Sequence, residues 1–182
     1  RFETNASTLE TSWTLTSEAL DMPHMPATGV SGLDLYARAA NGEWRFIGNG
    51  RPHNIRNEAT FKFPENFVSP RECLLYLPLY NGVQGLQIRV ASDSSLDAPQ
   101  PRVPDKRQPL VVYGTSIAQG GCASRPGMVW SSILGRLLDR PVINLGFSAS
   151  GTMEPPVGEV LAELDPAVYI IDCIWNMGDL SQ

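Results

Sequence analysis

The stretch Leu110–Gly121, which reads LVVYGTSIAQGG, decides the fold of the second half of the chain. Its apolar start, Leu110–Tyr113, predicts a short strand that is buried on both faces, as in a parallel sheet. Two more apolar runs, 142–145 and 167–171, predict further strands, and a helical pattern precedes each of them. This order of strand, helix, strand, helix and strand predicts an open parallel sheet with right-handed crossovers.

Two amphipathic patterns connect these strands. An apolar stripe over 129–138 predicts the first helix, which ends before Pro141 because proline cannot continue a helix. The second helix is predicted over 157–164, from apolar residues at i, i+3, i+4 and i+7. Ligands of open parallel sheets bind at the carboxyl ends of the strands, so we expect the chemistry in the three loops that follow them.

Residues 1–100 have the pattern of β-structure. Gly32–Ala39 alternates apolar and polar residues, and the turn dipeptide Asn41-Gly42 leads to a return strand at Trp44–Ile47. Further strands are predicted at 59–63, 73–77 and 85–90. Short strands between Gly, Pro and Asn clusters favour an all-β sandwich, jelly-roll-like, over 1–100.

The domain boundaries follow from a change in composition. A segment rich in Pro and Ser begins at Asp93 and lacks periodicity, and it predicts a linker at 101–108. Residues 109–182 then form the expected parallel α/β part. The chain has 182 residues, which is enough for one domain or two small ones at roughly 150 residues per domain.

Composition and charge exclude several classes of protein. Lys and Arg total 14 and Asp and Glu total 19, so the net charge of −5 argues against a nucleic-acid partner. A hydrophobic fraction of 42% with 18% charged residues excludes a disordered tail. No apolar run approaches the ~18 residues that span a bilayer, so we expect no membrane span.

Cysteines and histidines give no sign of a metal centre. Cys73, Cys122 and Cys173 form neither a CxxC pair nor a dense disulfide framework, and we expect buried or loop thiols. The two histidines, His24 and His53, have no partners at metal-ligand spacing. We therefore expect no metal and no cofactor.

Each of the three expected loops has an ordinary structural interpretation when it is taken alone. The first, Gly114–Gly121, lacks the Gly-Lys-Ser/Thr ending of a P-loop, and Ala118 breaks the esterase pattern GxSxG. A serine in such a turn is common. The second, Asn144–Gly151, fits a tight strand-to-helix connection, and Asn176 in the third fits a helix cap.

Together, the order and spacing of the three loops resemble the SGNH (GDSL-like) hydrolases, in particular the branch with an N-terminal β-domain. In that family a strand is followed by G-D-S-x-x-x-G. Gly114–Gly120 matches this block except that Thr115 stands in place of Asp. The resemblance implies that Ser116 is the nucleophile and that 109–182 is the first portion of a three-layer α/β/α domain.

The other two blocks of the family supply an oxyanion hole, the set of donors that binds the negative oxygen of the reaction intermediate. Asn144–Ser148 resembles the second block, which implies a substrate-binding role for Gly146 and a backbone N–H donor at Ala149, where the family has Gly. The stretch 172–176 resembles the third block and implies a side-chain amide donor at Asn176.

The general base of the family is a His in a D-x-x-H block near the C-terminus, and this sequence has no His after His53. We therefore expect the base outside the sequence shown, and no Ser116-dependent hydrolysis by these 182 residues alone. For the full-length protein the resemblance implies a serine carboxylic ester hydrolase. The expected substrate is an acyl ester, an acetyl ester above all, of a carbohydrate or small molecule, and the expected location is periplasmic or secreted.

Two hypotheses from other classes stay open. A non-catalytic carbohydrate-binding or assembly module, with a degenerate hydrolase domain, fits Thr115, Ala149 and the missing His. A nucleotide-binding α/β domain would use the glycine-rich loop, with Arg125 as its one basic candidate.

The aromatic residues of the first half have two interpretations. A sugar-stacking surface is one interpretation, and core packing, which we favour because aromatic side chains dominate sandwich cores, is the other. The four candidates are Trp13, Tyr36, Trp44 and Tyr80.

Overall fold

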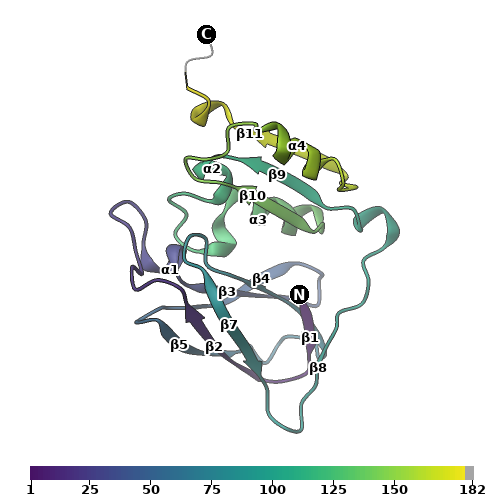
Figure 1. Cartoon of the computed structure of the whole chain (residues 1–182). Helices are drawn as coiled ribbons and strands as arrows, with labels where there is room; N and C mark the ends of the chain where they lie inside the picture. Colours follow the sequence, from purple (N-terminus) through teal and green to yellow (C-terminus); the bar gives the residue numbers. More distant parts are fainter. Residues whose placement is uncertain (179–182) are drawn as a thin grey trace. The chain divides into compact units, whose positions relative to one another are not determined.

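Two separate groups of strands make up the computed structural model, which describes residues 1–178 (Figure 1). The chain divides into two units by its internal contacts. The first contains Arg1–Gln100 together with the short segment Cys122–Met128. The second contains Pro101–Gly121 and the chain from Val129 onward. Residues 179–182 of the expected α/β part lie outside the described residues.

The first unit contains two antiparallel sheets. One has the strand order β4-β3-β6-β1-β8, and the other has the order β5-β2-β7. The five strands of the larger sheet are β1 (Phe2–Thr4), β3 (Leu33–Arg38), β4 (Trp44–Gly50), β6 (Arg71–Tyr76) and β8 (Leu96–Asp97). The smaller sheet contains β2 (Thr8–Leu15), β5 (Arg56–Lys62) and β7 (Val83–Arg89). One turn of helix, α1 (Ala27–Val30), precedes β3.

The core of the first unit lies between these two sheets. Leu9 and Phe61 from the smaller sheet and Leu35 and Cys73 from the larger one belong to the same buried cluster. The predicted all-β sandwich is therefore confirmed.

Strand β2, the central strand of the smaller sheet, differs from the expectation, because the sequence predicts no strand there. Its buried face contains a threonine, Thr11, between apolar residues, and its outward face is entirely polar. Thr11 fits the pleat because its hydroxyl donates to the carbonyl oxygen of Ala59. A β-branched polar residue on the buried face weakens the apolar alternation by which strands are recognised.

The second unit contains a parallel sheet with the order β10-β9-β11. Strand β9 (Leu110–Gly114) lies in the middle, between β10 (Val142–Gly146) and β11 (Val168–Asp172). The predicted parallel sheet is confirmed, and each strand extends to the residue beyond its predicted end. The helices are α2 (Ser116–Gln119), α3 (Trp130–Leu138) and α4 (Pro155–Leu161), with 3-10 turns η1 (Pro104–Lys106) and η3 (Ile174–Asn176).

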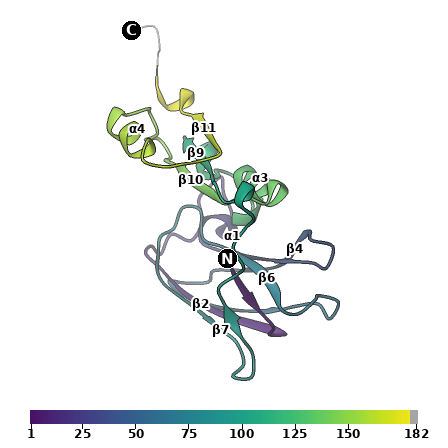
Figure 2. The same cartoon turned by 90° about the vertical axis from the view of Figure 1, so that its right-hand side faces the viewer.

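Helices cover both faces of this sheet, as Figures 1 and 2 show for α3 and α4. Leu161 of α4 packs in one cluster with Val111 and Tyr113 of β9. All five residues of β9 are buried, as expected for a central parallel strand covered on both sides. Within residues 1–178, no helix is long and apolar enough to cross a membrane.

We predict that Leu9→Ala lowers the free energy of unfolding by about 3 kcal/mol, because Leu9 is fully buried between the sheets and the change leaves a cavity. Urea unfolding measures the difference. Leu96→Ala is the control, since Leu96 is 40% exposed on a strand of the same unit and its truncation leaves no cavity. Equal losses from the two substitutions would contradict the core assignment.

Candidate active site

Ser116 lies at the carboxyl end of the central strand, as the first residue of α2. Thr115 is the N-cap of this helix, and its hydroxyl oxygen accepts a hydrogen bond from the Ile117 N–H at 3.2 Å. The Thr115 N–H in turn donates to the carbonyl oxygen of Asp172, at the end of β11. Thr and Asp side chains both cap helices in this way, so Thr115 preserves the local geometry that the family's Asp would give. Ser116 itself is half-buried.

The loop after β10 is bonded directly to the loop that carries Ser116. The Phe147 N–H donates to the Gly114 carbonyl oxygen at 2.8 Å. The Ser148 N–H donates to Oε1 of Gln119, also at 2.8 Å. Gly146 makes this approach possible, because a Cβ at that position would lie 2.0 Å from the Gln119 nitrogen. The first two loops thus share one edge of the sheet.

Ala149 adopts the left-handed conformation, with φ of +61°, and its side chain is exposed. Left-handed geometry costs a non-glycine residue about 1–2 kcal/mol. Two hydrogen bonds close the turn around it, from the N–H groups of Ser150 and Gly151 to the carbonyl oxygen of Phe147. Ala149 therefore adopts a backbone conformation that glycine adopts easily. The turn also sets the direction of the Ala149 N–H.

Asn176 ends the 3-10 turn after β11 and contacts the same second loop. Its Nδ2 donates to the Phe147 carbonyl oxygen at 3.4 Å, a long and therefore weak bond. The structure places Asn176 against the loop that contains Ala149, and the amide does not cap a helix there.

Asn144 fixes the helices that flank the site. Its Nδ2 donates to the Ala118 carbonyl oxygen at 2.8 Å and to the Ser131 hydroxyl at 3.0 Å. Its Oδ1 accepts from the Gly146 N–H at 2.9 Å. One side chain thereby connects α2, α3 and the end of β10.

A second group of hydrogen bonds, around Tyr113 and Glu154, stabilises the loop after β10. The Tyr113 hydroxyl donates to Oε2 of Glu154 and accepts from the Met153 N–H. The Thr152 hydroxyl donates to the other carboxylate oxygen of Glu154 at 2.8 Å. These bonds, with that from Tyr113 the strongest cause, lower the pKa of Glu154 to about 2. Burial, with the hydrogen bond to Glu154 as the second cause, raises the pKa of Tyr113.

Ser116, Ala149 and Asn176, the residues expected from the sequence, lie in the three loops at this edge of the sheet. Gln119 and the Tyr113–Glu154 pair are additional residues there that the sequence does not predict. The contacts of these residues join positions that are 29 and 41 apart in the chain. No periodicity or motif signals such pairings.

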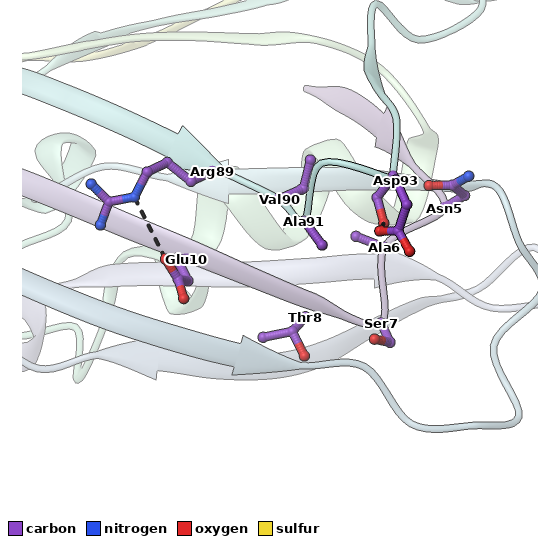
Figure 3. A pocket seen from close by; sticks show the side chains of 10 residues that line it. Asn5, Ala6, Ser7, Thr8, Glu10, Arg89, Val90, Ala91 and Asp93 are labelled. Carbon is purple, nitrogen blue, oxygen red and sulfur yellow. Dashed lines mark hydrogen bonds and ion pairs between the residues drawn. The ribbon is translucent and has the colours of Figure 1, made fainter.

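Two hollows on the first unit do not contain the residues of the candidate active site. One, of about 500 Å³, lies beside the end of β7, where Figure 3 shows the exposed ion pair of Glu10 and Arg89 at 3.5 Å. The other, of about 790 Å³, lies on the outer face of the β5-β2-β7 sheet and includes His53. Within residues 1–178, no three His, Cys, Asp or Glu side chains gather at metal-binding distance.

The aromatic residues of the first unit do not form an exposed stacking surface together. Trp13 and Tyr36 are only 1% and 5% exposed. The indole N–H of Trp13 donates to the Ser31 carbonyl oxygen inside the core. The packing interpretation is therefore correct for these two residues.

The fold and the site define a class of protein: a β-sandwich followed by a hydrolase-like parallel sheet, with a serine at the end of the central strand. Residues 1–96 match the family of the N-terminus of SGNH-hydrolase-type esterases, called GxDLY. Residues 107–181 match the GDSL-like lipase/acylhydrolase family. The chain belongs to the SGNH (GDSL-like) hydrolases.

Two solved structures resemble the chain. One is a crystal structure of a protein from Bacteroides ovatus assigned to the GDSL-like lipases, with 38% identity and a TM-score of 0.84 over 96% of this chain. The other is a salicylyl acyltransferase from a tetracycline biosynthetic pathway, with 16% identity and a TM-score of 0.68 over 92% of this chain. The chain spans 50% and 44% of these two proteins. No curated protein matches it.

We predict that Gly146→Ala lowers the free energy of unfolding by about 2 kcal/mol, since the added methyl group meets the backbone of Gln119 and overpacks the contact between two loops. Gly158→Ala in α4 is the matched control, because a Cβ there meets nothing within 4 Å and alanine favours a helix. Urea unfolding compares the two variants. Equal or stabilising effects at both glycines would refute the close approach.

A second prediction concerns pH. The folded pKa of Glu154 is about 2, below the ordinary value, so its carboxylate stabilises the fold above pH 4.5 and this contribution is lost as the pH falls towards 2. Tyr113→Phe removes the main cause and should make unfolding stability less dependent on pH between 5 and 2. Tyr169→Phe is the control, because the Tyr169 hydroxyl donates to carbonyl oxygens only. An unchanged pH slope in Tyr113→Phe would contradict the assignment.

Proposed function

We propose that this chain contributes the nucleophile and the oxyanion hole of a serine carboxylic ester hydrolase. One observation carries the proposal. Ser116 follows the buried central strand β9, and the loops after both neighbouring strands, with Ala149 and Asn176, are hydrogen-bonded at the same edge of the sheet. Polar groups at the carboxyl ends of parallel strands are where such folds bind ligands.

In the proposed reaction the Ser116 hydroxyl oxygen attacks the ester carbonyl carbon, and a general base takes its proton. The C–O bond to the alcohol then breaks, and the alcohol leaves with that proton. Water, activated by the same base, hydrolyses the acyl-enzyme and releases the acid. The N–H groups of Ser116 and Ala149 and the amide of Asn176 would donate to the oxyanion. The long bond from Asn176 to Phe147 is weak enough to exchange for this stronger acceptor.

The sequence contains two histidines, His24 and His53, and both lie in the first unit. Neither follows the nucleophile in the order that the family's D-x-x-H block requires. We therefore assign the general base to a part of the protein outside this sequence.

The proposed substrate is a short acyl ester, an acetyl group on a carbohydrate or other small alcohol, and the matching location is periplasmic or secreted. The second loop supports a polar alcohol, because Ser148, Ala149 and Ser150 are exposed and small. Their hydroxyl and backbone groups can bond sugar hydroxyls.

The alternative, a binding module with a degenerate hydrolase domain, is motivated by Thr115, by Ala149 and by the absence of a His after His53 in this sequence. Thr115 still caps the nucleophile helix, and Ala149 still adopts the left-handed turn. Both replacements preserve backbone geometry, and this favours an enzyme.

The test uses the complete gene product that contains this chain, with p-nitrophenyl acetate and an acetylated monosaccharide as substrates. Ser116→Ala should abolish turnover, and Asn176→Ala should lower kcat by about 10²–10³ because one oxyanion donor is lost. Ser92→Ala, an exposed serine of the first unit outside the proposed site, is the control and should retain activity. Turnover that survives Ser116→Ala refutes the nucleophile. Binding of the sugar without any turnover favours the module instead.

A further inference from the structure

The segment Cys122–Met128 belongs by its contacts to the β-sandwich, although it connects α2 to α3 of the other unit in the chain. Pro126 and Gly127 within it are buried. The Thr28 hydroxyl at the start of this unit's only α-helical turn, α1, donates to the Ser124 carbonyl oxygen at 2.6 Å. The chain therefore leaves the α/β unit directly after the nucleophile helix, packs against the sandwich, and returns.

Asp34 of β3 is the anchor for this segment. Its side chain is 0% exposed, and Oδ2 accepts from Nη1 of Arg125 and from the Gly127 N–H, both at 2.9 Å. Oδ1 accepts from Nδ2 of Asn49 at 2.8 Å. A buried carboxylate is tolerated only with such a complete set of partners. The charge thus fixes Arg125 and Gly127 in one geometry.

Tyr36 and Phe46 also contact the Arg125 side chain. Nη1 of Arg125 donates to the Tyr36 hydroxyl at 2.7 Å, and the guanidinium lies 3.9 Å from the Phe46 ring centroid. A Cβ on Gly127 would lie 2.3 Å from the Tyr36 ring, so only glycine fits beside it. Asp34 and Tyr36 both stand in the sequence Gly32-Leu-Asp-Leu-Tyr36, the GxDLY pattern of the N-terminal family.

Both ends of the segment lead directly to the nucleophile helix. The Gly121 N–H, just before the segment, donates to the Ser116 carbonyl oxygen at 2.7 Å. The Trp130 indole N–H, two residues after the segment, donates to the Ile117 carbonyl oxygen at 3.1 Å. The backbone carbonyl groups of the first two residues of α2 therefore accept from residues that flank the segment on either side in the chain.

We propose that Asp34 and Arg125 are positioning residues for Ser116, because they fix the segment that directly follows the nucleophile helix in the chain. The proposal rests on the proposed role of Ser116 as the nucleophile. Loss of either charge leaves its partner uncompensated and releases the segment. The effect passes to Ser116 through Gly121 and Trp130. A small displacement of the nucleophile lowers the reaction rate strongly.

The test compares Asp34→Asn, Arg125→Met, Arg125→Lys and the double variant Asp34→Asn/Arg125→Met in the complete gene product. Glu10→Gln is the matched control, because it removes a carboxylate from an exposed ion pair of the same unit. The measurements are kcat and KM with p-nitrophenyl acetate, the rate at which a fluorophosphonate labels Ser116, and hydrogen exchange of peptides covering 114–121. Near-UV circular dichroism checks that each variant is folded.

Asp34→Asn and Arg125→Met should each lower kcat and the labelling rate by about tenfold or more, with KM little changed. The double variant should be no worse than the worse single variant, because both act through one contact. Arg125→Lys should restore most of the rate, since a single atom, Nη1, makes both hydrogen bonds and an ammonium can replace it. Residues 114–121 should exchange faster in the two single variants than in Glu10→Gln.

Faster exchange confined to 122–128, with kcat and the exchange of 114–121 as in wild type, overturns the proposal. If Asp34→Asn does not fold, Arg125→Met still decides, because the Arg125 side chain is 23% exposed and its removal leaves Asp34 two other donors. Turnover that survives Ser116→Ala would refute the proposed function alone, and the exchange of 114–121 would still decide whether the Asp34–Arg125 contact affects the helix.

Discussion

The burial of β9 between two parallel partners is the constraint on which the candidate site depends. Because β10 and β11 are parallel to β9, all three strands end at one edge of the sheet. There Gly146 and Asp172, the last residues of β10 and β11, pair with Gly114, the last residue of β9. Backbone hydrogen bonds, from the Phe147 N–H to Gly114 and from the Thr115 N–H to Asp172, then connect the three following loops. Gln119, Asn144 and the Tyr113–Glu154 pair refine an arrangement that the register has already produced.

The replaced residues of the family blocks show which part of the site depends on side chains and which on backbone. Thr115 offers a hydroxyl oxygen where the family has a carboxylate, and the Ile117 N–H still finds its acceptor. Ala149 keeps an N–H and accepts the strain of a positive φ. A donor from the main chain survives replacement of its side chain, provided that the turn is held from outside. The bonds to the Phe147 carbonyl oxygen do this.

Much of the fold follows from local patterns in the sequence. The parallel strands, α3 and the position of Ser116 after β9 could be predicted, because each gives an apolar run, a helical stripe or a glycine-rich turn. Strand β2 was missed because Thr11 interrupts its apolar face. Contacts such as Ser148 to Gln119 could not be predicted, since they depend on the tertiary approach of two loops and leave no local signature.

The passage of Cys122–Met128 through the first unit has a consequence for modularity. The chain crosses between the units three times, after Gln100, Gly121 and Met128. The sandwich therefore cannot be removed as a unit by a single cut in the chain. Deletion of residues 1–100 would expose Pro126 and Gly127 and would remove Asp34, the acceptor of the Gly127 N–H. A recombination event that replaces residues 1–100 would also need a segment 122–128 that fits the new sandwich. The two parts are thus expected to be inherited as a pair.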